Sequence, residues 1–142
     1  FKSRPAAHLN PDYSTAPLMR ALEELLKSWR ANPDADARKR AVEHEVKMIG
    51  VTRRLGGPRA VCRVLSGQRY PEVEREQGLD WCRECIEDVL TAAREQDIVL
   101  GLENHYKDDF WTYPEFAQQM EVFCALIDRI LSDNPARLYF GE

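Results

Sequence analysis

The sequence lacks several features that mark whole classes of protein. No apolar run approaches the roughly 20 residues that a membrane-spanning helix needs, so we expect no membrane partner. There is no secretory signal at the start and no Asn-x-Ser/Thr acceptor, which favours a reducing, cytoplasmic location for the four cysteines. A basic excess is also missing, because 20 Lys and Arg face 24 Asp and Glu. The net charge of −4 therefore argues against a nucleic-acid partner.

The composition is that of an ordinary globular protein. Hydrophobic residues make up 44% of the chain and charged residues 31%. No repeat, low-complexity tract or linker divides the 142 residues, so we expect a single domain over 1–142. The chain begins at Phe1 and ends in "RLYFGE", which has the character of a strand. We therefore expect a fragment of a longer protein.

Apolar residues at helical spacing predict four helices. We expect the second to begin at Pro33 with Asn32 as its cap, and the third to begin near a cap at Asp80. Thr112 and Glu115 have the spacing of a capping box at the head of the fourth. The expected helices are 14–30, with Leu18, Leu22, Leu25 and Trp29; 33–56, with Val42, Val46 and Ile49 and a stop at Gly56-Gly57-Pro58; 79–96, with Cys82, Ile86, Val89, Leu90 and Ala93; and 112–134, with Phe116, Met120, Phe123, Ile127 and Leu131.

Short apolar runs between the helices predict strands at 60–65 and 98–102, and "RLYF" begins a third. Except for Arg63, the first two runs are apolar on both faces, which is typical of buried parallel strands. Strands that alternate with helices indicate βαβ units and an α/β fold. Parallel pairing would bring the carboxyl ends of the strands to one edge, where α/β proteins bind ligands.

Glu103 is the most informative residue at this expected edge. A carboxylate directly after five apolar residues needs a metal, a cation or a hydrogen-bond donor as partner. His105, two positions later, could ligate a metal or donate to a substrate oxygen. Alternatively, Glu103 ends the strand with a salt bridge and His105 is merely exposed.

The stretches "CRVLSGQRYPEVEREQGLDW" and "VLGLENHYKDDFWTYPEFAQQMEVF" resemble the xylose isomerase-like TIM-barrel superfamily. That superfamily contains sugar isomerases, epimerases and inosose dehydratases and, more distantly, AP endonucleases of the endonuclease IV type. The resemblance runs from about Arg38 to the C-terminus and is strongest around "GLENH". It implies a partial (β/α)8 barrel, about half of the full fold.

The resemblance also implies the chemistry. Glu103 matches the glutamate that binds a divalent metal ion (Mn, Mg, Co or Zn) and that serves epimerases as one of two acid/base carboxylates. The family's remaining ligands, an Asp, a His and a Glu, would lie beyond Glu142, so we expect this stretch alone to be inactive. The whole protein would be an isomerase or epimerase that moves a proton of a sugar or polyol through a metal-stabilised enediolate.

Three further residues are candidates for substrate binding. His105, Arg63 and Gln68 lie at or beside the strand ends and could bind substrate hydroxyls or, for Arg63 and Gln68, a phosphate. An internal salt bridge for Arg63 and a solvated loop for Gln68 are the structural alternatives. Trp111 and Phe110 could form an apolar wall over a sugar ring, or pack the following helix onto the barrel. A homo-oligomer is also compatible with the sequence.

Two other functions remain open. An endonuclease IV-like nuclease would need more His ligands and a basic groove. In an inactive barrel fragment or binding module, Glu103 would pair with Arg or Lys instead of a metal. Cys82-x-x-Cys85 lies within an expected helix with no second metal-binding pair, and the apolar stripe of that helix already includes Cys82. We therefore expect Cys82 in the core and no metal or redox role for the pair. Cys62 and Cys124 are likewise expected to be buried.

Overall fold

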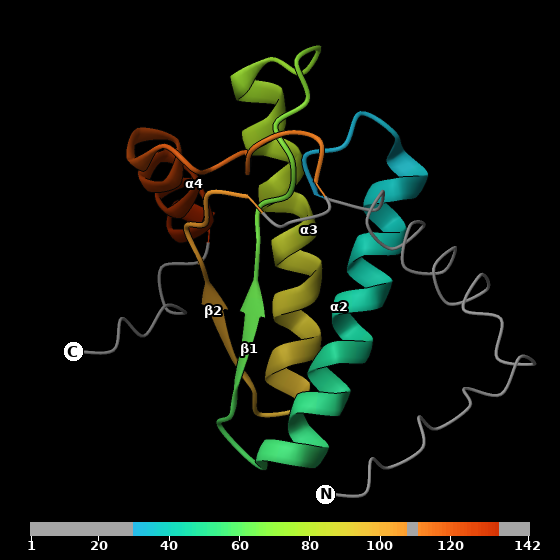
Figure 1. Cartoon of the computed structure of the whole chain (residues 1–142). Helices are drawn as coiled ribbons and strands as arrows, with labels where there is room; N and C mark the ends of the chain where they lie inside the picture. The colour runs from blue at the N-terminus through green and yellow to red at the C-terminus, as the bar shows by residue number, and fades with distance from the viewer. Residues whose placement is uncertain (1–29, 108–110, 134–142) are drawn as a thin grey trace, which may run out of the picture.

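The computed structural model describes residues 30–107 and 111–133. Their elements are, in order, α2 (Ala35–Gly56), β1 (Val61–Val64), α3 (Arg75–Glu95), β2 (Val99–Leu102) and α4 (Met120–Asp133). The two strands are parallel, with Val61 opposite Val99 and Val64 opposite Leu102. The predicted alternation of strands and helices and the parallel pairing are thus confirmed (Figure 1). The predicted helix 14–30, except Arg30, and the predicted third strand lie outside the described residues.

Helix α2 ends where predicted but begins differently. The Asp34 carboxylate accepts a hydrogen bond from the Asp36 amide at 2.9 Å, which makes Asp34 the cap and corrects the prediction of Asn32. The Asn32 side chain instead accepts from the Asp34 amide at 2.8 Å, in the turn before the helix. At the other end Gly57 has φ 76°, a left-handed value that glycine adopts without strain and that explains the stop.

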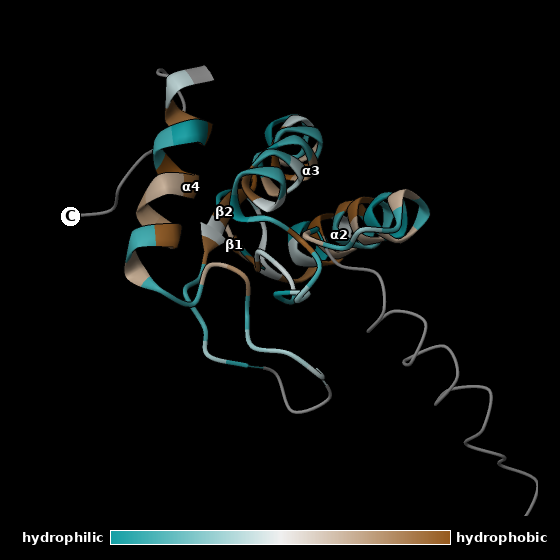
Figure 2. Cartoon of the chain, turned by 90° about the horizontal axis from the view of Figure 1, so that it is seen from above, coloured by the Kyte–Doolittle hydropathy of each residue, from teal (hydrophilic) through white to brown (hydrophobic). Residues whose placement is uncertain are grey.

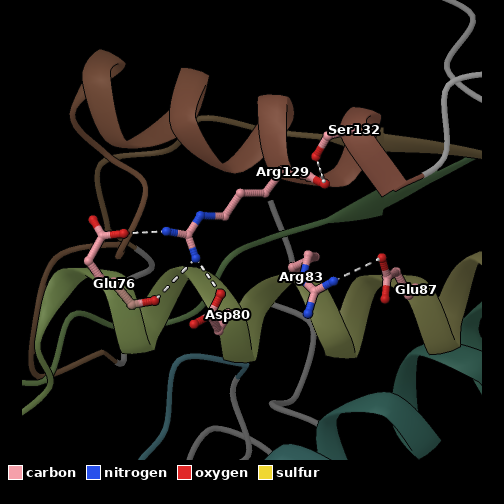
Figure 3. Close-up of polar contacts among 6 residues, drawn as sticks. All are labelled: Glu76, Asp80, Arg83, Glu87, Arg129 and Ser132. Atoms are coloured by element: carbon pink, nitrogen blue, oxygen red, sulfur yellow. Dashed lines mark hydrogen bonds and ion pairs between the residues drawn. The ribbon is translucent and has the colours of Figure 1, made fainter.

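Helix α3 begins earlier than predicted, at Arg75 with Glu74 as its cap. The predicted cap Asp80 is wrong: the first three residues of the helix, 75–77, are polar and exposed, so hydrophobic periodicity does not reveal them. Asp80 instead pairs with Arg129 of α4, which also contacts the Glu76 carboxylate (Figure 3). The same view shows Arg83 and Glu87 paired one turn apart along α3.

Helix α4 begins at Met120, so the capping box predicted at Thr112 and Glu115 is wrong. Residues 115–117 are buried but not helical. As a result the helix starts later than predicted and its buried face is Val122, Leu126 and Ile130. In the predicted stripe, Phe116 is buried but lies before the helix, Met120 is 64% exposed, and Phe123, Ile127 and Leu131 are only partly buried.

The core lies between the strand pair and the helices, which are arranged around it (Figure 2). Cys62 and Val64 are buried on the helix side, whereas Val61 is 65% exposed on the other face. The prediction that both faces are buried is therefore wrong for the described part of the chain. Cys82 lies in the core as predicted and Cys85 is also buried, but Cys124 is exposed, contrary to prediction. None of the helices in residues 30–107 and 111–133 is long and apolar enough to cross a membrane.

Candidate functional site

The carboxyl ends of β1 and β2 lie at the same edge of the sheet, as parallel pairing requires (Figure 1). The ladder continues one step beyond the strands, because the Glu103 amide donates to the Val64 carbonyl at 3.0 Å. The backbone of Glu103 is therefore held directly against the end of β1. This contact brings the exits of the two strands together.

Three of the four predicted site residues meet at the Glu103 carboxylate. Arg63 Nη1 lies 3.1 Å from Oε2, and His105 Nδ1 lies 3.8 Å from Oε1. The side chains are 53% (Arg63), 40% (Glu103) and 33% (His105) exposed, so the cluster is open to solvent. Arg63 is opposite Gly101, two residues before Glu103, which places both charged side chains on the exposed face of the strand pair. The cluster can therefore present a carboxylate, a cation and an imidazole to one small polar ligand.

Gln68 has a different environment. Its side chain is 6% exposed, so the solvated loop considered as its alternative is wrong. Its Oε1 accepts hydrogen bonds from the amides of Thr112 at 2.8 Å and Tyr113 at 3.0 Å. The described contacts of Gln68 thus hold the segment at 112–113. Trp111 is 2% exposed, which favours its packing role, and Phe110 lies outside the described residues.

Glu115, which was not predicted as a site residue, is a fully buried carboxylate behind this edge. Its Oε1 accepts from the amide and the hydroxyl of Ser66, each at 2.9 Å, and its Oε2 accepts from the His105 amide at 2.6 Å. Burial raises the pKa of the Glu115 carboxyl, although these hydrogen bonds oppose the effect. The available signal was an acidic residue directly before the apolar pair Phe116-Ala117, and the capping-box spacing concealed it.

A second buried charge cluster supports the exit of β1. Arg30 is 1% exposed, and it donates to Glu45 Oε2 at 2.8 Å and to the Leu65 carbonyl at 2.6 Å. The Cys62 thiol lies 3.4 Å from Glu45 Oε1, and burial raises the pKa of this thiol. The signal in the sequence was the position of Glu45, one helical turn before Ile49 on the buried stripe of α2. This cluster is covered by protein, so its role is structural.

The donors at the edge fit a divalent metal ion in part. Glu103 and His105 are common ligand types, and their 3.8 Å separation suits two ligands of one ion, which at bond lengths of about 2.1 Å lie roughly 3–4 Å apart. The Arg63 guanidinium at the other carboxylate oxygen opposes a second cation. Within residues 30–107 and 111–133 no group of three or more His, Cys, Asp or Glu side chains could hold a metal. A complete metal site would need ligands from outside this set.

Comparison with known proteins agrees with this architecture. A protein-family model described as a xylose isomerase-like TIM barrel matches residues 11–137, which is most of the chain. Neither the curated proteins nor the solved structures gave a significant match. Parallel strands alternating with helices, and polar side chains gathered at the carboxyl edge, are what a portion of such a barrel contains. The chain belongs to the xylose isomerase-like TIM barrel family, and its described residues form an α/β part of that barrel.

Proposed function

We propose that the protein is a carbohydrate isomerase or epimerase in which Glu103 is the proton-transferring carboxylate. The family includes sugar isomerases and AP endonuclease-like barrels, and small sugar-like molecules are the substrates expected of such a site. One observation carries the proposal. The Glu103 carboxylate is open to solvent, between a guanidinium and an imidazole, at the edge where TIM barrels place their active sites.

The three side chains have distinct roles in this proposal. Glu103 removes a proton from a carbon next to the substrate carbonyl and, in an isomerase, returns it to the neighbouring carbon. In an epimerase a second acid/base carboxylate, from outside the described residues, would protonate the opposite face of the same carbon. Arg63 binds the substrate oxygen on which negative charge develops. His105 hydrogen-bonds a neighbouring hydroxyl and so fixes the orientation of the substrate.

The proposal includes a divalent ion held by Glu103 and His105 together with ligands beyond the described residues. When bound, such an ion would polarise the substrate oxygens beside the carbon that loses its proton. The candidates for this ion are Mn, Mg, Co and Zn. Gln68 supports the site through its hydrogen bonds to the amides of Thr112 and Tyr113. In the proposal Gln68 therefore acts by holding the 112–113 segment beside the site, and its contact with the substrate stays a prediction.

A second candidate function is favoured by the same ion pair. Because Arg63 already neutralises Glu103 at 3.1 Å, the carboxylate has a partner without a metal. An inactive barrel that only binds a polar ligand would use the pair in this way. No described contact favours the nuclease, since His105 is the one histidine that the described residues place at this edge.

Solvent deuterium exchange distinguishes the two candidates. The whole protein, rather than residues 1–142 alone, is incubated in D₂O with Mn²⁺ and a panel of ketoses, aldoses and keto-polyols, and NMR follows the replacement of carbon-bound hydrogen by deuterium. The proposal expects exchange with at least one compound, reduced about 100-fold or more in Glu103→Gln because general-base catalysis contributes 10²–10⁴. The control Glu121→Gln, at an exposed carboxylate in the first turn of α4, should exchange like wild type. Binding without exchange would support the inactive module, and equal exchange in wild type and Glu103→Gln would refute the role of Glu103.

A further inference from the structure

Glu115 has a position that the reaction proposed above does not explain. It is a carboxylate with no exposed surface, and its two oxygens contact two different strand exits. Oε1 accepts from Ser66, which follows β1, and Oε2 accepts from the amide of His105, which follows β2. The Ser66 hydroxyl also accepts from the Ala117 amide at 2.9 Å, so the segment that contains Glu115 is held from both sides.

The hydrogen bonds at this position require a side chain with two acceptor oxygens, which a carboxyl group has. The backbone amides of Ser66 and His105 are both donors, and they face opposite oxygens of Glu115. A glutamine would direct its NH₂ group at one of them and leave a buried amide without an acceptor. An apolar side chain would leave both amides without this acceptor. Burying a carboxylate is costly, and at Glu115 the hydrogen bonds from Ser66 and His105 offset that cost.

Glu115 is connected to the candidate site through the backbone of His105. The His105 amide is held at 2.6 Å by Glu115, while the His105 ring lies 3.8 Å from Glu103. Glu103 is itself held by its amide against Val64 at the end of β1. Two backbone hydrogen bonds, one at each residue, therefore hold the backbone positions from which the ring and the carboxylate extend. Glu115 makes the one at His105.

We propose that Glu115 is a positioning residue, which sets the place of the His105 ring beside Glu103 by joining the exits of β1 and β2. Glu115 does not contact the substrate, because it is buried behind the edge. The inference rests on the proposed function, since the place of the ring matters to the reaction only if His105 and Glu103 act on the same molecule.

The test compares Glu115→Gln and Glu115→Asp with wild type, using the NMR signals of the histidine rings at one fixed pH. Asp retains the charge and the two oxygens but is one methylene shorter, so it cannot reach Ser66 and His105 together. We expect the His105 ring signals to shift in both variants while those of His44, on α2, stay unchanged. The control Glu121→Gln should move neither ring.

The outcomes separate this inference from the proposed function. In the exchange assay we expect Glu115→Gln to lower kcat about tenfold with little change in KM, whereas a purely structural role would lower only the melting temperature. Unshifted His105 signals in either folded variant, or failure of both variants to fold, would overturn the inference. If wild type exchanges no deuterium, the proposed function fails, and the His105 ring signals still decide whether Glu115 positions the ring.

Discussion

The substitution Gly78→Ala tests the packing that places the 111–117 segment behind the candidate site. A methyl group added at Gly78 would lie 2.4 Å from Phe116 Cε2 and 2.5 Å from Cζ, far inside van der Waals contact. Phe116 is 3% exposed, so its ring has little room to move away. Gly78→Ala should therefore force Phe116, and with it the neighbouring Glu115, out of its present position.

The magnitude follows from two opposing terms. Inserting a methyl group into a packed core costs about 1–3 kcal/mol. Replacing glycine with alanine inside a helix returns at most about 1 kcal/mol, and less in the first turn, where Gly78 lies. Gly50 is the matched control, because its added methyl would meet only the Gln96 side chain at 3.6 Å, an ordinary contact. Gly50→Ala should gain stability, so the two variants should differ by at least about 1 kcal/mol.

Urea unfolding followed by circular dichroism measures this difference. We expect Gly78→Ala to be less stable than wild type and Gly50→Ala to be as stable or more stable. Equal stability of the two variants would refute the close packing of Phe116 on α3.

Three further predictions concern buried charges and thiols. Arg30→Met leaves the Glu45 carboxylate without its cation and should cost about 3–5 kcal/mol, whereas Arg30→Met combined with Glu45→Leu should cost much less; equal losses in urea unfolding would contradict the buried pair. Burial raises the pKa of the Glu115 carboxyl above 4.5 in the folded protein. Its contribution to stability is therefore largest below that value and decreases as pH rises through the folded pKa. The unfolding free energy of wild type relative to Glu115→Gln should accordingly be higher near pH 4.5 than near pH 8. The opposite slope in paired urea titrations would show that the sign is wrong. Burial raises the pKa of Cys85 to about 11, so brief alkylation of the native protein near pH 8 followed by mass spectrometry should label the exposed Cys124 and spare Cys85; labelling of Cys85 at the same rate would contradict its burial.

The edge of the sheet was predictable because its signals are local in the sequence. Apolar runs of strand length alternate with helical periodicity, and parallel pairing then places their ends together. The arrangement of Arg63, Glu103 and His105 follows from this pairing and the alternation of side chains along each strand. The Arg63–Glu103 salt bridge corresponds to one of the alternatives that the sequence left open.

The buried carboxylates were not predictable in the same way. Glu115 is 49 residues from Ser66 in the sequence, and only the tertiary fold brings them together. Spacing from Thr112 gave Glu115 a plausible local role, so the local pattern was misleading. The start of α3 was misplaced for a related reason, because its first three residues, 75–77, are exposed and polar and so lack the apolar signal on which periodicity depends.

The family relationship alone does not define the reaction of this protein. A barrel can retain its strands and helices whether or not its edge performs chemistry. In this chain the edge retains a carboxylate and an imidazole, together with a guanidinium that competes with any cation for the carboxylate. Whether Glu103 binds a metal is therefore the point on which the account depends.

Calorimetric titration of Mn²⁺ into the whole protein, as wild type, Glu103→Gln and the control Glu121→Gln, tests that point most directly. Loss of a residue that only supports a metal ligand weakens binding about 10- to 100-fold, so loss of a ligand itself should weaken it by at least about tenfold. The account predicts saturable binding to wild type and the control, with an affinity at least tenfold weaker in Glu103→Gln. Equal affinity in wild type and Glu103→Gln, or no binding to wild type, would contradict it.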